Sequence, residues 1–501
     1  MRFQSLRSTA STTILFGVFL SMLLNTPALA RWSTPVRISE PGGGYYPQIL
    51  AQGDTLHVVY QIQLPYYKIC YVRSSDGGES WTEHNVLSDN DTAYNVQMPR
   101  TMLFGQKLIC IWLNGFRRGV YIWNLGYSVS DDDGLTWQAP RYVLSSNRQW
   151  PFNFAASAWD SLINIVAACS PNDTLAFYSI RSTNFGAGWT EPAEIYRAQQ
   201  AGMPDQTSFN GLIHFAWDGN FIWNRSWDTY YTKSTDGGLT WSGNVALSTI
   251  DQHGSQMPSI CVNAHGAVAV TWDDGKYSPY LLTGDILLRQ SSDSGNVWTP
   301  EVQVTFNHYA FGKSDIIAVG DTIHIAWEDE SLGLAHISIY YVRSTDNGNT
   351  WDDLYWLDQT TDNSWNPALA ASNGRTYAVW YDEPHYSDTV GLYFSRWGPE
   401  PDAVADEGRD EPPQEISPRA YPNPFNSSTT ITYSGFEKGG DVNICNATGQ
   451  LVRRFRVEAG GDGRIVWDAT DARGQRASSG TYFVKFFCDG HSKTLRLIYV
   501  K

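Results

Sequence analysis

One eight-residue pattern recurs along the chain and limits its fold more than any other feature. The pattern Ser-x-Asp-x-Gly-x-x-Trp occurs five times, and a sixth copy carries Asn in place of Asp. The six copies occupy Ser74–Trp81, Ser130–Trp137, Ser182–Trp189, Ser234–Trp241, Ser291–Trp298 and Ser344–Trp351. Self-similarity at a period of about 20–50 residues is typical of proteins built from one repeated supersecondary unit.

A second landmark precedes each copy and counts the units. Short strand entries are centred on Pro47, Pro99, Pro151, Pro204, Pro258, Ser314 and Pro367, at intervals of 52, 52, 53, 54, 56 and 53 residues. Each of the first six units contains four short strand-like runs, and the eight-residue pattern lies between the third and the fourth. Four antiparallel strands per unit of about 50 residues predict the blades of a β-propeller.

The composition agrees with an all-β chain. The sequence has 43 Gly, 21 Trp, 28 Tyr and 21 Phe among 501 residues. Aromatic residues suit a pleated, half-buried surface, and Gly marks its turns. The net charge of −16 without a basic run argues against nucleic acid as a partner.

The two ends of the repeat region complement each other. The seventh unit has early strands, from Pro367 to Trp397, but no copy of the pattern and no fourth strand. Residues 32–39 resemble the last strand of the first unit, residues 81–88. We therefore expect a seven-bladed propeller over residues 31–398, in which the N-terminal strand completes the last blade and removes its open edge.

Residues 1–30 have the architecture of a secretory signal peptide. Arg2 and Arg7 precede an apolar run from Ile14 to Leu24, and residues 28–30 form a small-residue cleavage site. Removing two arginines and no acid changes the net charge from −16 to −18. No later run is long enough to span a bilayer. We expect a protein exported through the periplasm and then secreted or held at the cell surface, without a transmembrane segment.

The composition changes after the repeats. Residues 399–420 are rich in Pro, Asp and Glu and are predicted to be an exposed linker. Residues 421–501 show a compact β-pattern with six strand-like runs. We expect a small second domain there.

The repeated pattern resembles the Asp-box of the sialidase-like propellers, and the resemblance covers residues 31–398. In that family the boxes lie on the face opposite the active site and support the fold. The resemblance implies a structural role for Asp76, Asp132, Asn184, Asp236, Asp293 and Asp346. Asp-boxes occur in sugar-cleaving, sugar-binding and purely scaffolding propellers, so the resemblance does not decide activity.

The second domain resembles the Ig-like C-terminal sorting domain of the type IX secretion system, which is related to the Ig-like domain of flagellar hook-capping proteins. The opening Tyr-Pro-Asn-Pro-Phe-Asn at residues 421–426, the Ser-Gly-Thr-Tyr at residues 479–482 and the basic, apolar ending carry this resemblance. It implies that residues 421–501 are recognised by the type IX machinery. An ordinary Ig-like spacer is the alternative.

Strand entries and the loops after second strands share one face of such a propeller. A sialidase has an Arg two residues before the first strand-entry Pro, as one of three that hold the sialic-acid carboxylate. That position is occupied here, unit by unit, by Tyr45, Gln97, Gln149, Gly202, Gln256, Gly312 and Trp365. Because none is Arg, we expect little or no sialidase activity. The loops add Tyr66, Tyr67, Trp123, Trp223, Trp227, Tyr277, Tyr280 and Tyr386. Rings and amides of this kind suit a neutral, hydroxyl-rich ligand, although each ring also suits packing between blades.

Acidic residues end several second strands. Asp218, Asp273, Glu328 and Asp382 are the candidates for a catalytic pair of carboxyl groups, as glycoside hydrolysis requires. They also suit Ca²⁺ binding, which needs oxygen ligands, or plain solvated loop charge. No other cofactor is indicated. Three functions stay open: a glycan-binding propeller, a glycoside hydrolase, and a scaffold for protein partners.

Overall fold

The protein is described by a computed structural model that forms two compact units, residues 1–401 and residues 402–501. The described residues are 31–40, 42–63, 67–88, 96–114, 124–143, 151–170, 175–198, 200–220, 227–278, 283–331, 336–360, 362–383, 390–398, 419–421, 423, 425–436, 439–446, 451–457, 461–471, 473–488 and 491–500.

The described residues of the first unit form seven antiparallel sheets of four or five strands. Six of these sheets are made of strands that follow one another in the sequence, and the last combines strands from both ends of the unit. The first three contain β3 (Gly43–Gln52), β4 (Thr55–Ile62), β5 (Lys68–Ser74) and β6 (Asn85–Val86); β7 (Val96–Phe104), β8 (Lys107–Asn114), β9 (Asn124–Ser130) and β10 (Arg141–Tyr142); and β11 (Pro151–Trp159), β12 (Leu162–Cys169), β13 (Leu175–Ser182) and β14 (Ala193–Ala198). The fourth and fifth contain β15 (Gln200–Ala201), β16 (Asp205–Phe209), β17 (Leu212–Asn220), β18 (Asp228–Ser234) and β19 (Val245–Ala246); and β20 (Ser255–Val262), β21 (Val268–Asp274), β22 (Asp285–Ser291) and β23 (Val302–Gln303). The sixth contains β24 (Ala310–Val319), β25 (Thr322–Asp329), β26 (Ser338–Ser344) and β27 (Tyr355–Trp356), and the last β28 (Asn363–Ser372), β29 (Arg375–Glu383) and β30 (Gly391–Gly398) with β1 (Arg31–Trp32) and β2 (Val36–Arg37).

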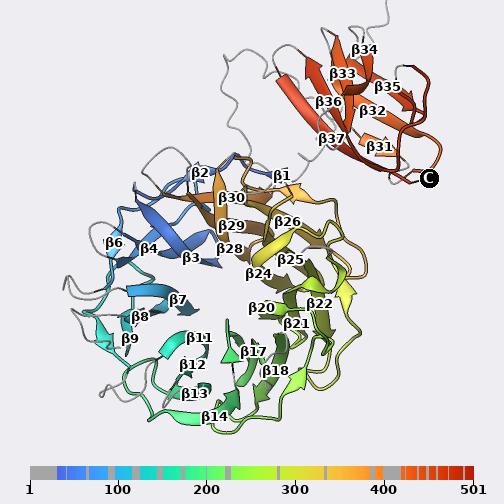
Figure 1. Ribbon diagram of the computed structural model, residues 1–501. Helices are drawn as coiled ribbons and strands as arrows, with labels where there is room; N and C mark the ends of the chain where they lie inside the picture. Colours follow the sequence, from blue (N-terminus) through green and yellow to red (C-terminus); the bar gives the residue numbers. More distant parts are fainter. Residues whose placement is uncertain are drawn as a thin grey trace, which may run out of the picture. The chain divides into compact units, whose positions relative to one another are not determined.

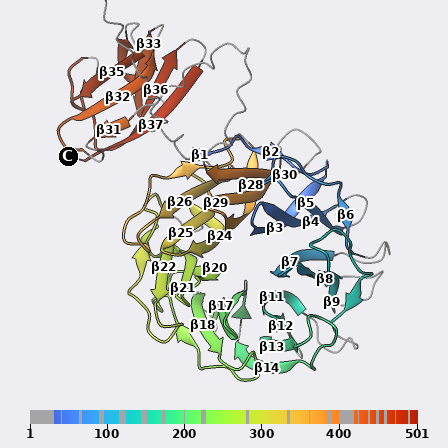
Figure 2. The same ribbon diagram turned by 180° about the vertical axis from the view of Figure 1, so that it is seen from behind.

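The sheets are arranged around a common centre in the manner of a β-propeller, with β3, β7, β11, β20 and β24 nearest the centre of their sheets (Figures 1 and 2). The N-terminal strands pair with the last long strand of the unit: Trp32 lies opposite Trp397 in β1–β30, and Val36 lies opposite Phe394 in β2–β30. The last sheet also packs against the first, through contacts of β28 and β29 with β3. Strands from both ends of the repeat region therefore share one sheet.

The second strand of each sheet is the most buried and supplies much of the core. Large aromatic residues near its end are fully buried, with Trp112, Trp217, Trp272, Trp327 and Trp380 all 2% exposed or less. Such rings fill the space between neighbouring sheets, as where Phe177 of β13 contacts Trp217 of β17 with ring centroids 5.1 Å apart. Burial of these rings is the main source of stability between sheets.

The repeated eight-residue pattern forms a tight turn after each third strand that carries it. In the fourth sheet, Asp236 Oδ1 accepts hydrogen bonds from the backbone N–H of Thr240 (2.9 Å) and from the hydroxyl of Ser234 (2.8 Å). The Asn184 side chain accepts from Gly188 N (2.8 Å) in the same way. The side-chain oxygen therefore satisfies backbone donors that the turn leaves unpaired.

A long side chain at the end of the third strand contacts the turn of the next sheet. Lys233 Nζ, for example, donates to Ser294 O at 2.8 Å, and Arg73 Nε donates to Asp133 O at 3.0 Å. The same contact joins the last sheet to the first, because Arg396 Nη1 donates to Gly77 O at 3.2 Å.

The second unit contains two antiparallel sheets. One has the order β31-β32-β35 and the other β34-β33-β36-β37. Their bounds are β31 (Arg419–Tyr421), β32 (Thr429–Phe436), β33 (Gly440–Asn446), β34 (Leu451–Val457), β35 (Gly461–Trp467), β36 (Gly480–Cys488) and β37 (His491–Tyr499). The two sheets share a core that includes the fully buried Trp467 and Phe486. In the described part of the chain, no helix is long and apolar enough to cross a membrane.

Candidate functional site

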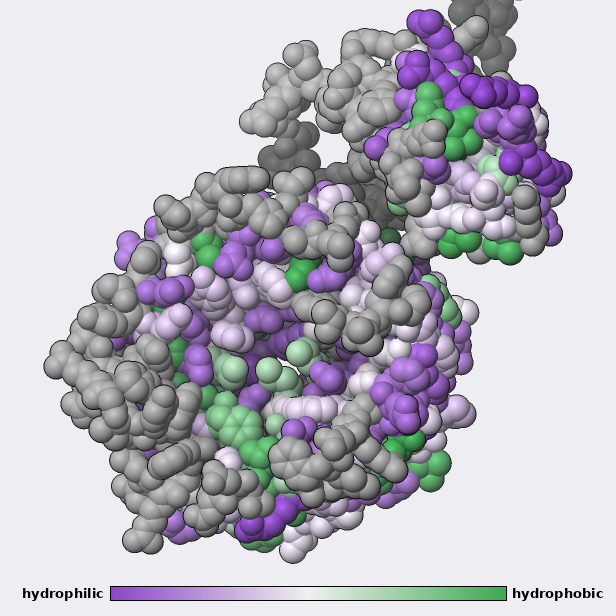
Figure 3. Space-filling view, in the orientation of Figure 1, coloured by the Kyte–Doolittle hydropathy of each residue, from purple (hydrophilic) through white to green (hydrophobic). Residues whose placement is uncertain are grey.

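The first strands begin, and the second strands end, at one end of the sheets, and the sequence candidates gather there. The molecular surface is hollowed at the centre of the ring, where hydrophilic and weakly hydrophobic side chains lie together (Figure 3). The candidate carboxyl groups come from the ends of the second strands β17, β21, β25 and β29.

Asp218 joins two neighbouring sheets through its carboxylate. Its Oδ1 accepts from Met203 N (2.6 Å), which lies between β15 and β16 of its own sheet, and its Oδ2 accepts from Met257 N (2.9 Å) in β20 of the next sheet. The side chain is 2% exposed, and this burial raises its pKa to about 6 despite the backbone donors. Both oxygens are thus used as acceptors for backbone N–H groups.

Asp273 and Glu328 make the same kind of bond one and two sheets further along. Asp273 Oδ2 accepts from Gly312 N at 3.2 Å, and Glu328 Oε1 accepts from Asn366 N at 2.7 Å. Glu328 Oε2 also accepts from Lys313 N at 3.3 Å. Burial raises the pKa of Asp273 well above its usual range and that of Glu328 to about 7. Gly312 has a φ of 90°, which favours glycine, and a Cβ there would also displace the Glu328 carboxylate.

Asp382 differs from the other three candidates. It follows Tyr381 in β29 by one residue, so its side chain lies on the opposite face of the sheet from that of Tyr381. The Ser364 hydroxyl donates to Asp382 Oδ1 at 2.7 Å, and burial together with the nearby Asp358 raises the pKa of Asp382 to about 7. Asp382 therefore has different partners from the other three candidates, whereas Asp273 and Glu328 accept hydrogen bonds from the adjacent residues Gly312 and Lys313.

A second layer of charged groups surrounds the centre. Asp205 Oδ2 accepts from Ile260 N (2.9 Å) of the next sheet, and Asp315 Oδ2 accepts from Leu369 N (2.7 Å). Arg100 and Lys313 are half-buried nearby; burial lowers the pKa of both, while Asp205 and Asp315 act in the opposite sense. Sequence reasoning did not single out Asp205, Lys313 and Asp315 as charged neighbours across the ring, because nothing in the repeat marks them as such.

The pairing of the first strand with the second strand identifies equivalent strand-entry residues in different sheets more reliably than the proline spacing does. Four of these positions pair with the residue after the second-strand aromatic position: Tyr45 with Gln61, Gln97 with Leu113, Gln256 with Asp273 and Trp365 with Tyr381. In the third sheet the pair is Asn153 with Ala168, so the counterpart is Asn153, four residues after the expected Gln149. The reason is that β11 has its irregularity between Pro151 and Asn153 and pairs regularly after Asn153, whereas β3, β7, β20 and β28 have an irregularity directly after the strand-entry position. Gln149, Trp223 and Tyr386 lie outside the described residues.

Aromatic side chains from the last and first sheets meet at this end. Trp365 lies opposite Tyr381 in the β28–β29 pair, and the Tyr381 ring lies 5.0 Å from the Tyr45 ring of β3. Tyr45 Oη donates to Gln63 Oε1 at 3.2 Å. These three aromatic side chains are half-buried, so part of each faces solvent. We call Tyr45, Tyr381 and Trp365 the aromatic cluster; Tyr381 was not a sequence candidate, and its register with Trp365 is what reveals it.

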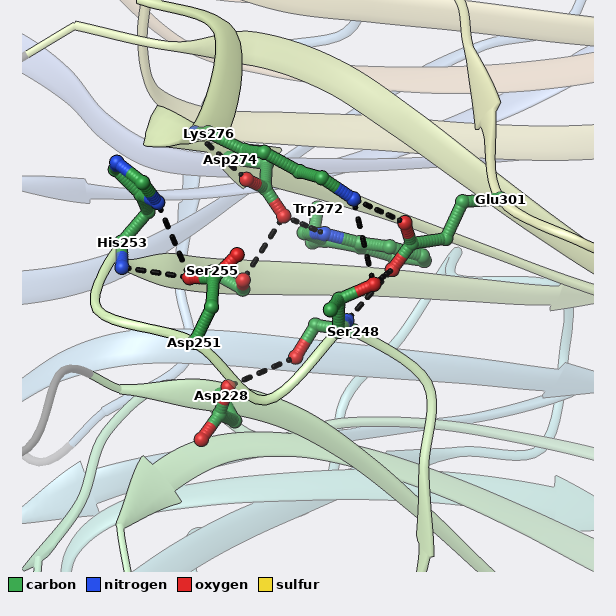
Figure 4. A network of polar contacts seen from close by, with 10 residues as sticks. Asp228, Ser248, Asp251, His253, Ser255, Trp272, Asp274, Lys276 and Glu301 are labelled. Carbon is green, nitrogen blue, oxygen red and sulfur yellow. Dashed lines mark hydrogen bonds and ion pairs between the residues drawn. The ribbon is translucent and has the colours of Figure 1, made fainter.

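The region beside Tyr277 and Trp227 is occupied by a polar network between the fourth and fifth sheets (Figure 4). Asp274 accepts from the hydroxyl of Ser255 (2.9 Å) and from Trp272 Nε1 (2.8 Å), and Lys276 forms an ion pair with Glu301 (2.9 Å). Tyr277 is 44% exposed, whereas Trp227 is half-buried and its carbonyl accepts from Ser255 N. The network fixes the loop on which Tyr277 stands.

Metal binding was one alternative for the acids. Within the described ranges, no group of three or more His, Cys, Asp or Glu side chains is arranged to hold a metal ion. The carboxylate oxygens of Asp218 and Glu328 already accept hydrogen bonds from backbone N–H groups. Ca²⁺ binding stays a prediction.

Comparison with known proteins supports the two folds. Residues 426–486 match the profile of the FlgD Ig-like domain. No curated protein sequence matches the chain. Among solved structures, an ulvan lyase of a new family of polysaccharide lyases aligns with a TM-score of 0.53 and 12% identity, over 72% of this chain and 95% of that chain. The same enzyme bound to -[GlcA(1-4)Rha3S]- aligns with a TM-score of 0.52 and 12% identity, over the same shares.

Sialidases are also similar at a lower score. The Trypanosoma rangeli sialidase in complex with the inhibitor DANA aligns with a TM-score of 0.44 and 11% identity, over 92% of this chain and 87% of that chain. At these identities the similarity concerns the fold, and we carry no residue role from these enzymes to this chain.

Proposed function

We propose that this chain is an exported glycan-binding β-propeller that holds its ligand at the end of the sheets where the aromatic cluster lies. The observation that carries the proposal is the row of half-buried rings Trp365, Tyr381 and Tyr45, which spans the junction of the last and first sheets. Flat rings pack against the C–H faces of sugars, while amides such as that of Gln63 bond their hydroxyls. A structurally similar chain is a polysaccharide lyase, which agrees with a glycan as ligand.

We favour binding over hydrolysis because of what the candidate acids bond. Asp218, Asp273 and Glu328 accept backbone N–H groups of neighbouring sheets, and Asp382 is 4% exposed beside Ser364. A general acid or nucleophile must reach the scissile bond, whereas Asp218, Glu328 and Asp382 are buried, and the half-buried Asp273 is held by Gly312 N. They act as ties between sheets in this proposal.

A pair of Trp variants tests the ligand face. Trp365→Ala is expected to weaken binding of a neutral oligosaccharide by about three- to tenfold, as the loss of one stacking contact implies. Trp159→Ala is the matched control, because Trp159 is 39% exposed and ends β11 at the opposite end of the sheets. Isothermal titration of both variants against a glycan panel, with melting temperatures as a fold check, gives the comparison. Equal losses in the two variants would refute the assignment of the face.

We also propose that the seven sheets are the blades of a closed propeller completed by the N-terminal strand. The support is the pairing of β1 and β2 with β30 and the Arg396 to Gly77 hydrogen bond, which repeats the contact between consecutive sheets. A variant beginning at residue 40 should melt at a lower temperature than one beginning at residue 31. An unchanged melting temperature would contradict closure by this strand.

The targeting proposal concerns the two ends of the chain. Residues 1–30 would direct export to the periplasm, and the Ig-like residues 421–501 would be recognised by a type IX secretion system, with the acidic linker 399–420 between. Deleting residues 421–501 should leave the propeller folded in the periplasm. Normal delivery of the truncated protein to the surface or medium would end this part of the proposal.

A further inference from the structure

The loop before β24 carries an imidazole that is fixed by a buried carboxylate. His308 Nδ1 lies 2.6 Å from Asp285 Oδ2, and the His308 backbone N–H donates to Asp285 Oδ1 at 3.1 Å. The Asp285 side chain is 0% exposed, while the His308 side chain is 35% exposed. The pair joins the start of β22 in the fifth sheet to the loop that enters the sixth.

The bonds at Asp285 determine which nitrogen of His308 carries the proton. Both carboxylate oxygens are acceptors, since Thr305 Oγ1 donates to Oδ1 (3.0 Å) and Gln303 Nε2 donates to Oδ2 (3.2 Å). The neutral imidazole therefore has its hydrogen on Nδ1, and Nε2 presents a lone pair.

The Nε2 atom of His308 is directed to solvent, unlike the nitrogens of the structural histidines. His57, His214 and His324 are at most 5% exposed, and each has Nδ1 within 2.8 Å of a buried Tyr hydroxyl. His308 Nε2 is neither buried nor hydrogen-bonded in the described part of the structure. Its orientation leaves an acceptor free at the surface.

The backbone at His308 is held as firmly as the ring. Its φ is 62°, in the left-handed region that a non-glycine residue seldom adopts, and Thr283 Oγ1 donates to the His308 carbonyl at 2.8 Å. Left-handed backbone of this kind persists where the surroundings fix it and is frequent at ligand sites.

The position of His308 relates it to the aromatic cluster. It precedes β24, and β24 packs beside β28, which carries Trp365 at its beginning. Both residues therefore lie at the strand-entry end of neighbouring sheets.

We propose that His308 Nε2 accepts a hydrogen bond from a hydroxyl group of the bound glycan, and that Asp285 is the positioning residue that holds the imidazole in the tautomer able to do so. A sugar hydroxyl is the matching donor, because an unprotonated imidazole nitrogen is an acceptor that a neutral polyol satisfies without a counter-charge. This inference rests on the proposed glycan-binding function.

Nuclear magnetic resonance of the full chain with ¹⁵N-labelled histidine tests the tautomer without a ligand. The His308 spectrum, assigned by its loss in His308→Phe, should show protonated Nδ1 and unprotonated Nε2 at pH 7.5. In Asp285→Asn the amide is able to donate to Nδ1, so the Nε2–H tautomer should increase. A wild-type His308 with its proton on Nε2 would overturn the proposal.

Titration with xylohexaose, cellohexaose and mannohexaose tests the contact. The oligosaccharide that binds should shift the Nε2 resonance of His308, and His308→Phe should weaken its binding about fivefold, as the loss of one hydrogen bond implies. His253→Phe is the matched control, since His253 also has an Asp partner, Asp251 at 3.2 Å, but is 52% exposed. It should bind as the wild type does.

The outcomes distinguish the role of His308 from the proposed glycan-binding function. Binding that is lost in Trp365→Ala but unchanged in His308→Phe, with no shift at Nε2, refutes the role of His308 and leaves the proposed function. A wild-type protein that binds none of the three oligosaccharides refutes both.

Discussion

Replacing Asp218 by Asn is expected to stabilise the protein at alkaline pH, because burial makes ionisation of this carboxyl unfavourable. The pKa of Asp218 is raised from 3.8 to about 6 in the folded protein. The folded state therefore keeps this proton where the unfolded chain has already released it. The contribution of Asp218 to the free energy of unfolding is greatest below pH 3.8 and falls as the pH rises through about 6.

The size of the effect follows from the pKa difference. A rise from 3.8 to about 6 corresponds to about 3 kcal/mol at pH 8, at about 1.36 kcal/mol per pKa unit. Asn has the shape of the protonated acid, keeps one carbonyl acceptor for Met203 N or Met257 N, and does not titrate. The difference in unfolding free energy between Asp218→Asn and the wild type should therefore grow by about 2–3 kcal/mol from pH 4 to pH 8, or about 4 °C in melting temperature for a domain of this size.

Urea denaturation at pH 4, 6 and 8, followed by Trp fluorescence, measures this difference. Parallel pH profiles for the two proteins would show that Asp218 does not titrate as proposed. A variant that is less stable than the wild type at pH 8 would show that losing the hydrogen bond to the second backbone N–H group costs more free energy than burying the ionised carboxylate. Either result would refute the reasoning.

Three further outcomes are expected. For Asp236→Asn the stability difference from the wild type should depend on pH with the opposite sign, because turn hydrogen bonds lower the pKa of Asp236 to about 2. Melting curves should show the wild type losing stability relative to the variant as the pH falls from 4 to 2. Gly295→Ala should lower the melting temperature far more than Gly105→Ala, since a Cβ at residue 295 would lie 1.9 Å from Tyr231 Oη while residue 105 has open space and a similar positive φ. A fluorogenic sialoside should release no measurable sialic acid, because a neutral residue stands where the sialidase arginine would be at each described strand entry, and strong release would contradict that expectation.

The sequence predicted the repeated units, but it did not predict the contacts between them. The eight-residue pattern and its spacing predicted the strands and the turns, because both depend on residues close in the chain, such as Ser234 and Asp236. The environment of Asp218 depends on Met257, 39 residues away in another sheet, and the orientation of His308 depends on Asp285, 23 residues away. Local patterns carry no information on such partners. The shift from Gln149 to Asn153 has a similar cause, since one irregular residue pair in β11 moves the register.

The carboxylate ties are unevenly distributed around the ring. In the fourth to sixth sheets the position after the second-strand aromatic is Asp218, Asp273 or Glu328, and each accepts an N–H group of the following sheet. In the first three sheets the same position holds Gln61, Leu113 and Ala168. The amide hydrogens of Met257, Gly312 and Asn366 should therefore exchange slowly with solvent deuterium, whereas those near the centre of the first three sheets should exchange sooner. Local opening of this ring is thus expected to begin in its first three sheets, which are the part of the ring that is synthesised first.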